Sequence, residues 1–179
     1  RGPGVSYIRI GRMVTVMKRN NSYRYPKTQR EKIDGKRHYV FDKEKLPSVT
    51  TILDVTQSAE KREALANWRA SKGEAEATRI VDESGARGTA MHKILEMYIL
   101  EQGYMDETNV GKQAHNMAIQ VIQSGLSNVT EYYGTECTLY YPGLYAGQTD
   151  LVGIHKGQDA IIDFKQTNKP KKREWIDDY

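Results

Sequence analysis

The hydrophobic and polar positions of the first 45 residues follow a strand-like pattern only in part. Alternation over residues 5–18 predicts two strands that are broken near Gly11. Residues 19–37 are polar and irregular, with turn-forming residues in several places. The Asp-Gly pair at 34–35 predicts a hairpin turn that leads into a strand at 38–41.

The middle of the chain has apolar residues at helical spacing. We predict a short helix that begins at Pro47 and is capped by Ser48 or a residue before it. The longer helices are expected at about 59–72, 74–84, 88–102 and 106–124, and the glycines at 73, 85 and 103 are expected to end the first three.

The pattern changes to a period of two after residue 128. Strands are predicted at 129–141, 144–154 and 159–165, joined by turns at Pro142-Gly143 and Lys156-Gly157. Helices followed by a three-stranded meander favour an α+β or α/β core. The 179 residues suffice for one domain with a hydrophobic core of its own.

Composition excludes several classes of protein. No run approaches the roughly 18 apolar residues that a membrane span needs, and no signal peptide is visible. We predict no membrane partner, and a location in the cytoplasm of a bacterial or phage-infected host cell. Cys137 is the single cysteine, which excludes a disulfide framework and a four-cysteine iron–sulfur cluster. We interpret it as a packing residue and not as a nucleophile.

Charge is distributed unevenly along the chain. Residues 1–45 contain 13 Lys and Arg and four Asp and Glu, whereas residues 46–179 contain 14 basic and 19 acidic residues. Residues 1–45 therefore carry a net charge of +9, and residues 46–179 a net charge of −5. A basic arm on an acidic body favours an anionic partner, most simply nucleic acid. The alternative is a solvated N-terminal segment without a partner.

Two carboxylates and a lysine lie at the ends of otherwise apolar strands. Asp163 and Lys165 are two apart in the last predicted strand, so both side chains are expected on one face, with Asp150 in cross-strand reach. Two close carboxylates repel unless a cation lies between them, and oxygen ligands favour Mg²⁺ or Mn²⁺. The alternative is an Asp–Lys ion pair on the surface at the end of a hairpin.

Three segments together resemble one family. Asp150 followed by Asp163-Phe164-Lys165 resembles the signature of the PD-(D/E)xK nuclease superfamily, with Thr149 in place of its usual proline. The segment 87–96 (RGTAMHKILE) is similar to the Gly-Thr-x-x-His helix motif of the RecB-like branch. The segment 46–53 (LPSVTTIL) resembles one common in phage exonucleases and in the mitochondrial genome maintenance exonuclease. The resemblance covers roughly 46–179.

The resemblance implies a restriction-endonuclease-like α+β core, with a central mixed sheet flanked by helices and a helical N-terminal half. We expect one domain overall, in which residues 1–45 form a basic arm and 46–179 the nuclease core. The family usually has a Gln-x-x-x-Tyr helix after the lysine, and the chain ends at Tyr179 before such a motif. We therefore expect the core to be incomplete at its C-terminal end.

The resemblance also implies the roles of individual residues. His92, Asp150, Asp163 and the backbone carbonyl of Phe164 would be metal ligands, and Asp150, Asp163 and Lys165 the catalytic set. Supporting roles are expected for Glu96, Glu136 and Thr167. Contacts with nucleic acid are expected from Arg87, Lys169, Lys171, Lys172 and Arg173. The other histidines, His38, His115 and His155, have no metal-like spacing and are interpreted as ordinary.

The predicted function is a Mg²⁺- or Mn²⁺-dependent deoxyribonuclease. The resemblance implies an exonuclease that acts on single strands or DNA ends, in phage or bacterial recombination or repair. One alternative is an endonuclease of the same fold, which differs by cutting closed circles. A second alternative is a non-catalytic nucleic-acid-binding module, against which the intact Asp150, Asp163 and Lys165 argue.

Overall fold

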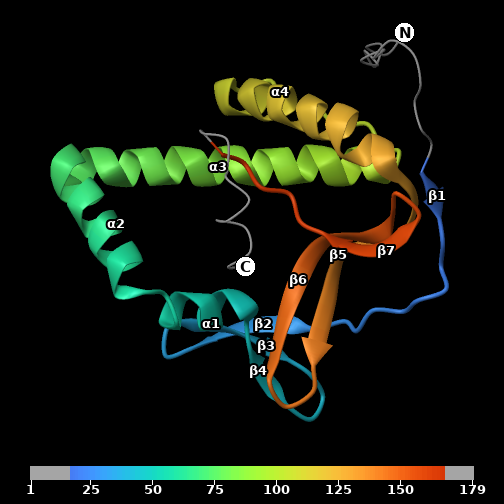
Figure 1. Ribbon diagram of the computed structural model, residues 1–179, viewed down its shortest axis with the longest axis horizontal. Helices are drawn as coiled ribbons and strands as arrows, with labels where there is room; N and C mark the ends of the chain where they lie inside the picture. Colours follow the sequence, from blue (N-terminus) through green and yellow to red (C-terminus); the bar gives the residue numbers. More distant parts are fainter. Residues whose placement is uncertain (1–16, 168–179) are drawn as a thin grey trace, which may run out of the picture.

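Two β-sheets form the strand part of residues 17–167, which are the residues that the computed structural model describes (Figure 1). The larger sheet has the order β1-β5-β6-β7, and the smaller one the order β2-β3-β4. The strands are β1 (Lys18–Arg19), β2 (Gln29–Ile33), β3 (Lys36–Val40), β4 (Lys45–Pro47), β5 (Val129–Tyr141), β6 (Tyr145–His155) and β7 (Gln158–Ile162).

The larger sheet is mixed, because β1 pairs with β5 in parallel while β5, β6 and β7 form an antiparallel meander. With the helices this confirms the α+β fold class and the predicted meander. The smaller sheet is antiparallel, and its β2–β3 hairpin turns at Asp34 and Gly35 as predicted. Residues 5–16 of the two strands predicted over 5–18, and the basic run at 169–173, lie outside the described residues.

Helix α3 (Glu74–Ile99) lies between the larger sheet and helix α4 (Asn109–Ser124) (Figure 1). A single turn of 3₁₀-helix, Leu126–Asn128, connects α4 to β5. The main core is formed where these elements meet, and its most buried side chains are Met91, Leu95, Ile99, Ala114, Ala118, Val129 and Leu151. Removal of this apolar surface from water is the main force that holds α3 on the sheet.

The prediction of a helix break at Gly85 is wrong, because α3 continues through Gly85 and Gly88. A glycine inside a helix costs only about 1 kcal/mol relative to alanine. The buried stripe of Met91, Leu95 and Ile99 on the same helix offsets that cost. As a result one helix of 26 residues, roughly 39 Å long, brings the motif around His92 against the sheet.

The predicted helix end at Gly103 is also wrong, because α3 ends at Ile99. Glu101 takes the left-handed conformation, with φ of 56°. The N–H groups of Glu101 and Gln102 donate to the carbonyls of Tyr98 and Met97. This pair of hydrogen bonds is a Schellman motif, in which glutamate takes the position usually held by glycine.

The remaining helices differ from the predictions mainly at their ends. Ser48 caps α1 (Val49–Val55) as predicted, but Pro47 closes β4 and does not begin the helix. Helix α2 (Ala59–Lys72) ends at Gly73 as predicted. Helix α4 starts three residues after the predicted position, behind the cap residue Thr108. In the described part of the chain, no helix has the length and apolar character needed to cross a membrane.

Candidate metal centre

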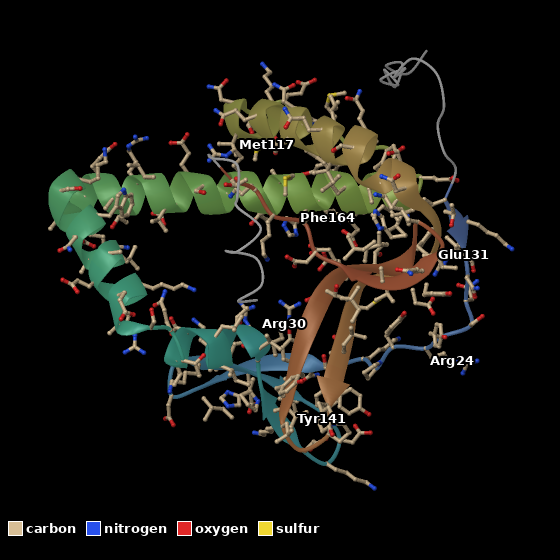
Figure 2. The ribbon with its side chains drawn as sticks, in the orientation of Figure 1. Arg24, Arg30, Met117, Glu131, Tyr141 and Phe164 are labelled. Atoms are coloured by element: carbon tan, nitrogen blue, oxygen red, sulfur yellow. The ribbon has the colours of Figure 1, made fainter. Side chains whose placement is uncertain are left out.

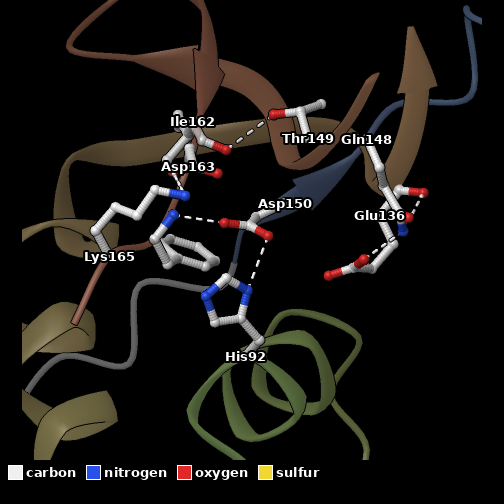
Figure 3. A network of polar contacts seen from close by, with 9 residues as sticks. His92, Glu136, Gln148, Thr149, Asp150, Ile162, Asp163 and Lys165 are labelled. Atoms are coloured by element: carbon white, nitrogen blue, oxygen red, sulfur yellow. Dashed lines mark hydrogen bonds and ion pairs between the residues drawn. The ribbon is translucent and has the colours of Figure 1, made fainter. Parts of the chain in front are cut away.

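Three elements that are far apart in the sequence bring a histidine and two carboxylates together. Helix α3 supplies His92, β5 supplies Glu136 and β6 supplies Asp150 (Figure 3). One ligand atom from each of the three lies within 4.8 Å of the other two. All three residues are partly buried, so each keeps some contact with solvent.

Asp150 is at the centre of the cluster because both of its carboxylate oxygens have partners. Oδ1 lies 3.0 Å from Nδ1 of His92, and Oδ2 accepts the backbone N–H of Phe164. Burial by itself would raise the pKa of Asp150, but these two hydrogen bonds, together with the charges of His92 and Lys165, more than offset it and lower the pKa. The hydrogen bond to Asp150 correspondingly raises the pKa of His92.

Glu136 approaches the cluster in a strained backbone conformation. Its φ is 52°, in the left-handed region that costs a non-glycine residue roughly 1–2 kcal/mol. Thr135 pairs with Leu151 and Cys137 with Thr149, so this register places Glu136 opposite Asp150. Burial, and next the charge of Asp150, raise the pKa of Glu136. The carboxylate also accepts a hydrogen bond from the Gln148 side chain.

These residues fit a divalent cation. Two carboxylates and one imidazole form a mixed oxygen and nitrogen donor set of the kind that can hold a divalent metal ion. The raised pKa of Glu136, after the effect of burial, reflects repulsion by Asp150, and a cation held between them would relieve that repulsion. We therefore regard His92, Glu136 and Asp150 as the candidate metal centre.

Asp163 and Lys165 lie beside this centre but outside the regular strand. The prediction that both stand on one strand face is wrong, because β7 ends at Ile162. The two side chains nevertheless meet in an ion pair, with Nζ of Lys165 2.7 Å from Oδ2 of Asp163. Their side chains are 46% and 59% exposed, so this contact by itself matches the alternative of a surface ion pair.

The segment after Lys165 is fastened to α3 through Gln166, which the sequence analysis missed. The Gln166 amide N–H₂ donates to the backbone carbonyl of Ser84 and lies 3.2 Å from its hydroxyl. Its carbonyl accepts from Nε of Arg87 at 3.1 Å. The nuclease motif names Lys165 but gives no reason to single out the next residue, so the sequence contained no signal for this contact.

The other predicted residues have varied positions. Arg87 is engaged with Gln166 and with Gln113, and Glu96 pairs with Lys93 at 3.0 Å. The ring of Phe164 is buried and lies edge-on to the ring of His92. The roles predicted for Glu96, Thr167 and the Phe164 carbonyl stay predictions. Lys169, Lys171, Lys172 and Arg173 lie outside the described residues.

Comparison with known proteins identifies a distant relative of the chain. No family model matches the chain. The chain is 29% identical over 133 residues to the protein named mitochondrial genome maintenance exonuclease 1 of Mus musculus. The match covers 70% of this chain and 38% of the relative, so the chain spans well under half of the mouse protein. This distant similarity to an exonuclease, together with the candidate metal centre, supports a nuclease.

Proposed function

We propose that the chain is a Mg²⁺- or Mn²⁺-dependent nuclease that hydrolyses DNA phosphodiester bonds, and that it acts as an exonuclease on single strands or DNA ends in recombination or repair. The observation that carries the proposal is the group His92, Glu136 and Asp150 beside Lys165. The mouse relative, named an exonuclease, supports the same class of reaction.

His92, Glu136 and Asp150 would hold the cation. When bound, the cation supplies a positive charge that polarises the scissile phosphate and makes a water molecule more acidic. The hydrogen bond between Phe164 N–H and Asp150 fixes the Asp150 carboxylate, so that its orientation does not depend on the ion. We propose Asp163 and the carbonyl of Phe164 as further ligands.

Lys165 would act on the reacting groups directly. Its ammonium group is held by the ion pair with Asp163 beside the centre, and its charge contributes to lowering the pKa of Asp150. From this position it can orient the attacking water or stabilise the negative charge that develops on the phosphate oxygens. Gln166, fixed to α3 by Ser84 and Arg87, limits the freedom of the Lys165 backbone.

Nucleic acid would be held mainly through its phosphates. We propose that Arg87, the lysines and arginine of 169–173 and the basic segment 1–45 contact the backbone without reading sequence. In this assignment the basic segment is an arm of the nuclease core at 46–179, within one domain.

A nuclease assay with matched substrates tests the proposal. The protein is incubated with Mg²⁺ or Mn²⁺ and with linear or circular DNA, each single- or double-stranded. We expect loss of linear single strands from their ends, inhibition by EDTA, and at least a hundredfold slower reaction in Lys165→Ala, consistent with loss of one charge-stabilising group. Lys112→Ala, which removes a lysine from an exposed position of α4, is the control.

Two results would contradict the proposal. Equal rates for Lys165→Ala and the unmodified protein would show that Lys165 has no part in the reaction. Cleavage of closed circles as fast as linear strands would show that the protein is an endonuclease and not an exonuclease.

A further inference from the structure

A groove runs from the candidate metal centre along β6 to the tip of the β5–β6 hairpin. Its volume is about 780 Å³. Glu136, Asp150, Asp163 and Lys165 line one end, and Tyr140, Tyr141 and Tyr145 line the other. Val49 and Leu53 of α1 also line the groove. Tyr141 lies at the far end of the hairpin from α3 (Figure 2).

The hairpin tip exposes aromatic surface that the described part of the fold does not cover. Tyr141 and Tyr145 form a cross-strand pair, with ring centroids 6.1 Å apart, and their exposures are 58% and 41%. Tyr140 is 46% exposed, but its ring also packs on the ring of Phe41, with centroids 4.6 Å apart, and so contributes to the structure of the tip. Exposed aromatic rings beside a groove are typical of a binding surface.

We propose that this groove binds unpaired nucleotides of a DNA strand next to the bond that is cleaved, with bases stacked on Tyr141 and Tyr145. The inference rests on the proposed function, because it takes the substrate to be DNA that is cut at the centre. Every base has a flat face that stacks on an aromatic ring, so such a surface binds single strands of any sequence. In a duplex these faces are already stacked on neighbouring bases, so the groove selects unpaired DNA.

The charges along the groove agree with this occupant. The carboxylates of Glu136, Asp150 and Asp163 are gathered at the end where the cation is proposed. Away from that end the charged residue in the lining is Arg37 of β3, which can pair with a phosphate. A strand would therefore meet negative charge only where a bound cation compensates it.

The spacing between the metal centre and the tyrosine pair predicts that binding depends on the length of the oligonucleotide. The backbone positions of Asp150 and Tyr145 are five residues apart on β6, which at about 3.3 Å per residue is roughly 17 Å along the strand. A stacked strand has one phosphate per roughly 3.4 Å, so about five nucleotides span the distance. Oligonucleotides of two or three residues would reach the centre without reaching the tyrosine pair.

Binding measurements separate the groove from the chemistry. Fluorescence anisotropy is measured with labelled oligothymidylates of 3 to 12 residues and with a blunt two-strand duplex that has no loop, in Ca²⁺ to slow cleavage. We expect Tyr141→Ala and Tyr145→Ala each to weaken binding of the 12-mer by at least about fivefold. Binding of the 3-mer and of the duplex should stay unchanged, and Tyr141→Phe should restore 12-mer binding.

Tyr104→Ala is the matched control. Tyr104 is 41% exposed, as Tyr145 is, but lies between α3 and α4 and does not line the groove. Far-ultraviolet circular dichroism and Tm of each variant check that it is folded. Unchanged 12-mer binding in both folded alanine variants, or equal weakening for the duplex, would overturn the inference.

A small substrate distinguishes failure of the groove from failure of the proposed function. Thymidine 5′-(p-nitrophenyl phosphate) is too short to reach Tyr145. If the alanine variants hydrolyse it at the unmodified rate but lose 12-mer binding, the inference is supported. If the unmodified protein binds the 12-mer through the tyrosines but hydrolyses neither substrate with Mg²⁺ or Mn²⁺, the groove is supported while the nuclease proposal fails.

Discussion

The side chain of Gln166 packs against Gly88 of α3, so that a Cβ atom at position 88 would come within 2.9 Å of Nε2 of Gln166. Gly88 is the glycine of the Gly-Thr-x-x-His motif on α3, and Gln166 follows Lys165. The missing side chain thus makes room for the residue that fastens the lysine segment to the helix. This contact gives a physical reason for a glycine inside a helix.

Gly88→Ala should separate activity from stability. The substitution favours the helix by about 0.5–1 kcal/mol. It also displaces the Gln166 amide from Ser84 and Arg87, and each net hydrogen bond contributes about 1 kcal/mol. We therefore expect a free energy of unfolding that is unchanged or slightly lower, and a clearly reduced kcat on DNA, measured by urea unfolding and a nuclease assay.

Gly85→Ala is the control, since a Cβ there meets no atom within 4 Å. It should raise the free energy of unfolding by about 0.5–1 kcal/mol and leave kcat unchanged. Equal kcat for the two variants would show that Gln166 does not position Lys165.

Metal affinity should depend on residues from three separate elements. His92→Ala removes one donor of the centre, while Glu136→Gln and Asp150→Asn replace a charged oxygen donor by a neutral amide. We expect each to weaken Mn²⁺ binding by at least roughly 10-fold, the lower end of the range seen when only the partners of metal ligands are removed. Isothermal titration calorimetry measures the effect.

Glu83→Gln serves as the acidic control on α3, because that carboxylate pairs with Arg79 away from the centre. If His92→Ala and Glu83→Gln bind Mn²⁺ equally well, the imidazole is not a ligand.

The parts of the fold that could be predicted from sequence are those with local signals. The meander, the turn at 34–35 and the Ser48 cap each depend on residues close together in the chain. Strand β2 was missed because its sequence, QREKI, is mostly charged and its side chains are mostly exposed, so no alternation marks it. The helix break at Gly85 was wrong because tertiary packing of α3 outweighs a local glycine cost.

The candidate site likewise has a part that local sequence signals predict and a part that depends on tertiary contacts. His92, Asp150 and Glu136 could be named from a resemblance in their local motifs, and the structure brings them together. The contacts of Gln166 with Ser84 and Arg87 depend on residues about 80 positions apart, for which a single sequence holds no signal. The left-handed backbone conformation of Glu136 could not be predicted either, because this conformation is usually taken by glycine or asparagine.

Stability at acid pH should depend on Asp106. Hydrogen bonds from the Thr108 side chain and backbone lower the pKa of Asp106 below its usual 3.8. A lowered folded pKa gives stability that is present above the unfolded value and is lost as pH falls through the folded value. Below about pH 4 the unmodified protein should therefore lose stability more steeply than Asp106→Asn.

Urea midpoints between pH 3 and 6 measure this difference. Asp82→Asn, at an exposed position of α3, is the control and should follow the unmodified protein. Parallel pH profiles for Asp106→Asn and the unmodified protein would contradict the prediction.

The pairing of β5 with β6 should be most sensitive at Gly153. A Cβ there would lie 2.4 Å from the carbonyl oxygen of Glu131 and 3.1 Å from Cα of Tyr132, where the register of the two strands shifts. Because backbone atoms cannot move aside as a side chain end can, Gly153→Ala should lower the free energy of unfolding by about 1–3 kcal/mol. It should also weaken Mn²⁺ binding, since Glu136 and Asp150 stand on these two strands.

Gly147→Ala on the same strand is the comparison, because its Cβ would meet only the side chain of Val49, at 3.2 Å. That side chain can shift by a few tenths of an ångström, so the loss of stability should be smaller and Mn²⁺ affinity retained. Urea unfolding and calorimetry measure both variants. If Gly153→Ala were as stable as Gly147→Ala, the close contact with the Glu131 backbone would not constrain the pairing that carries the metal centre.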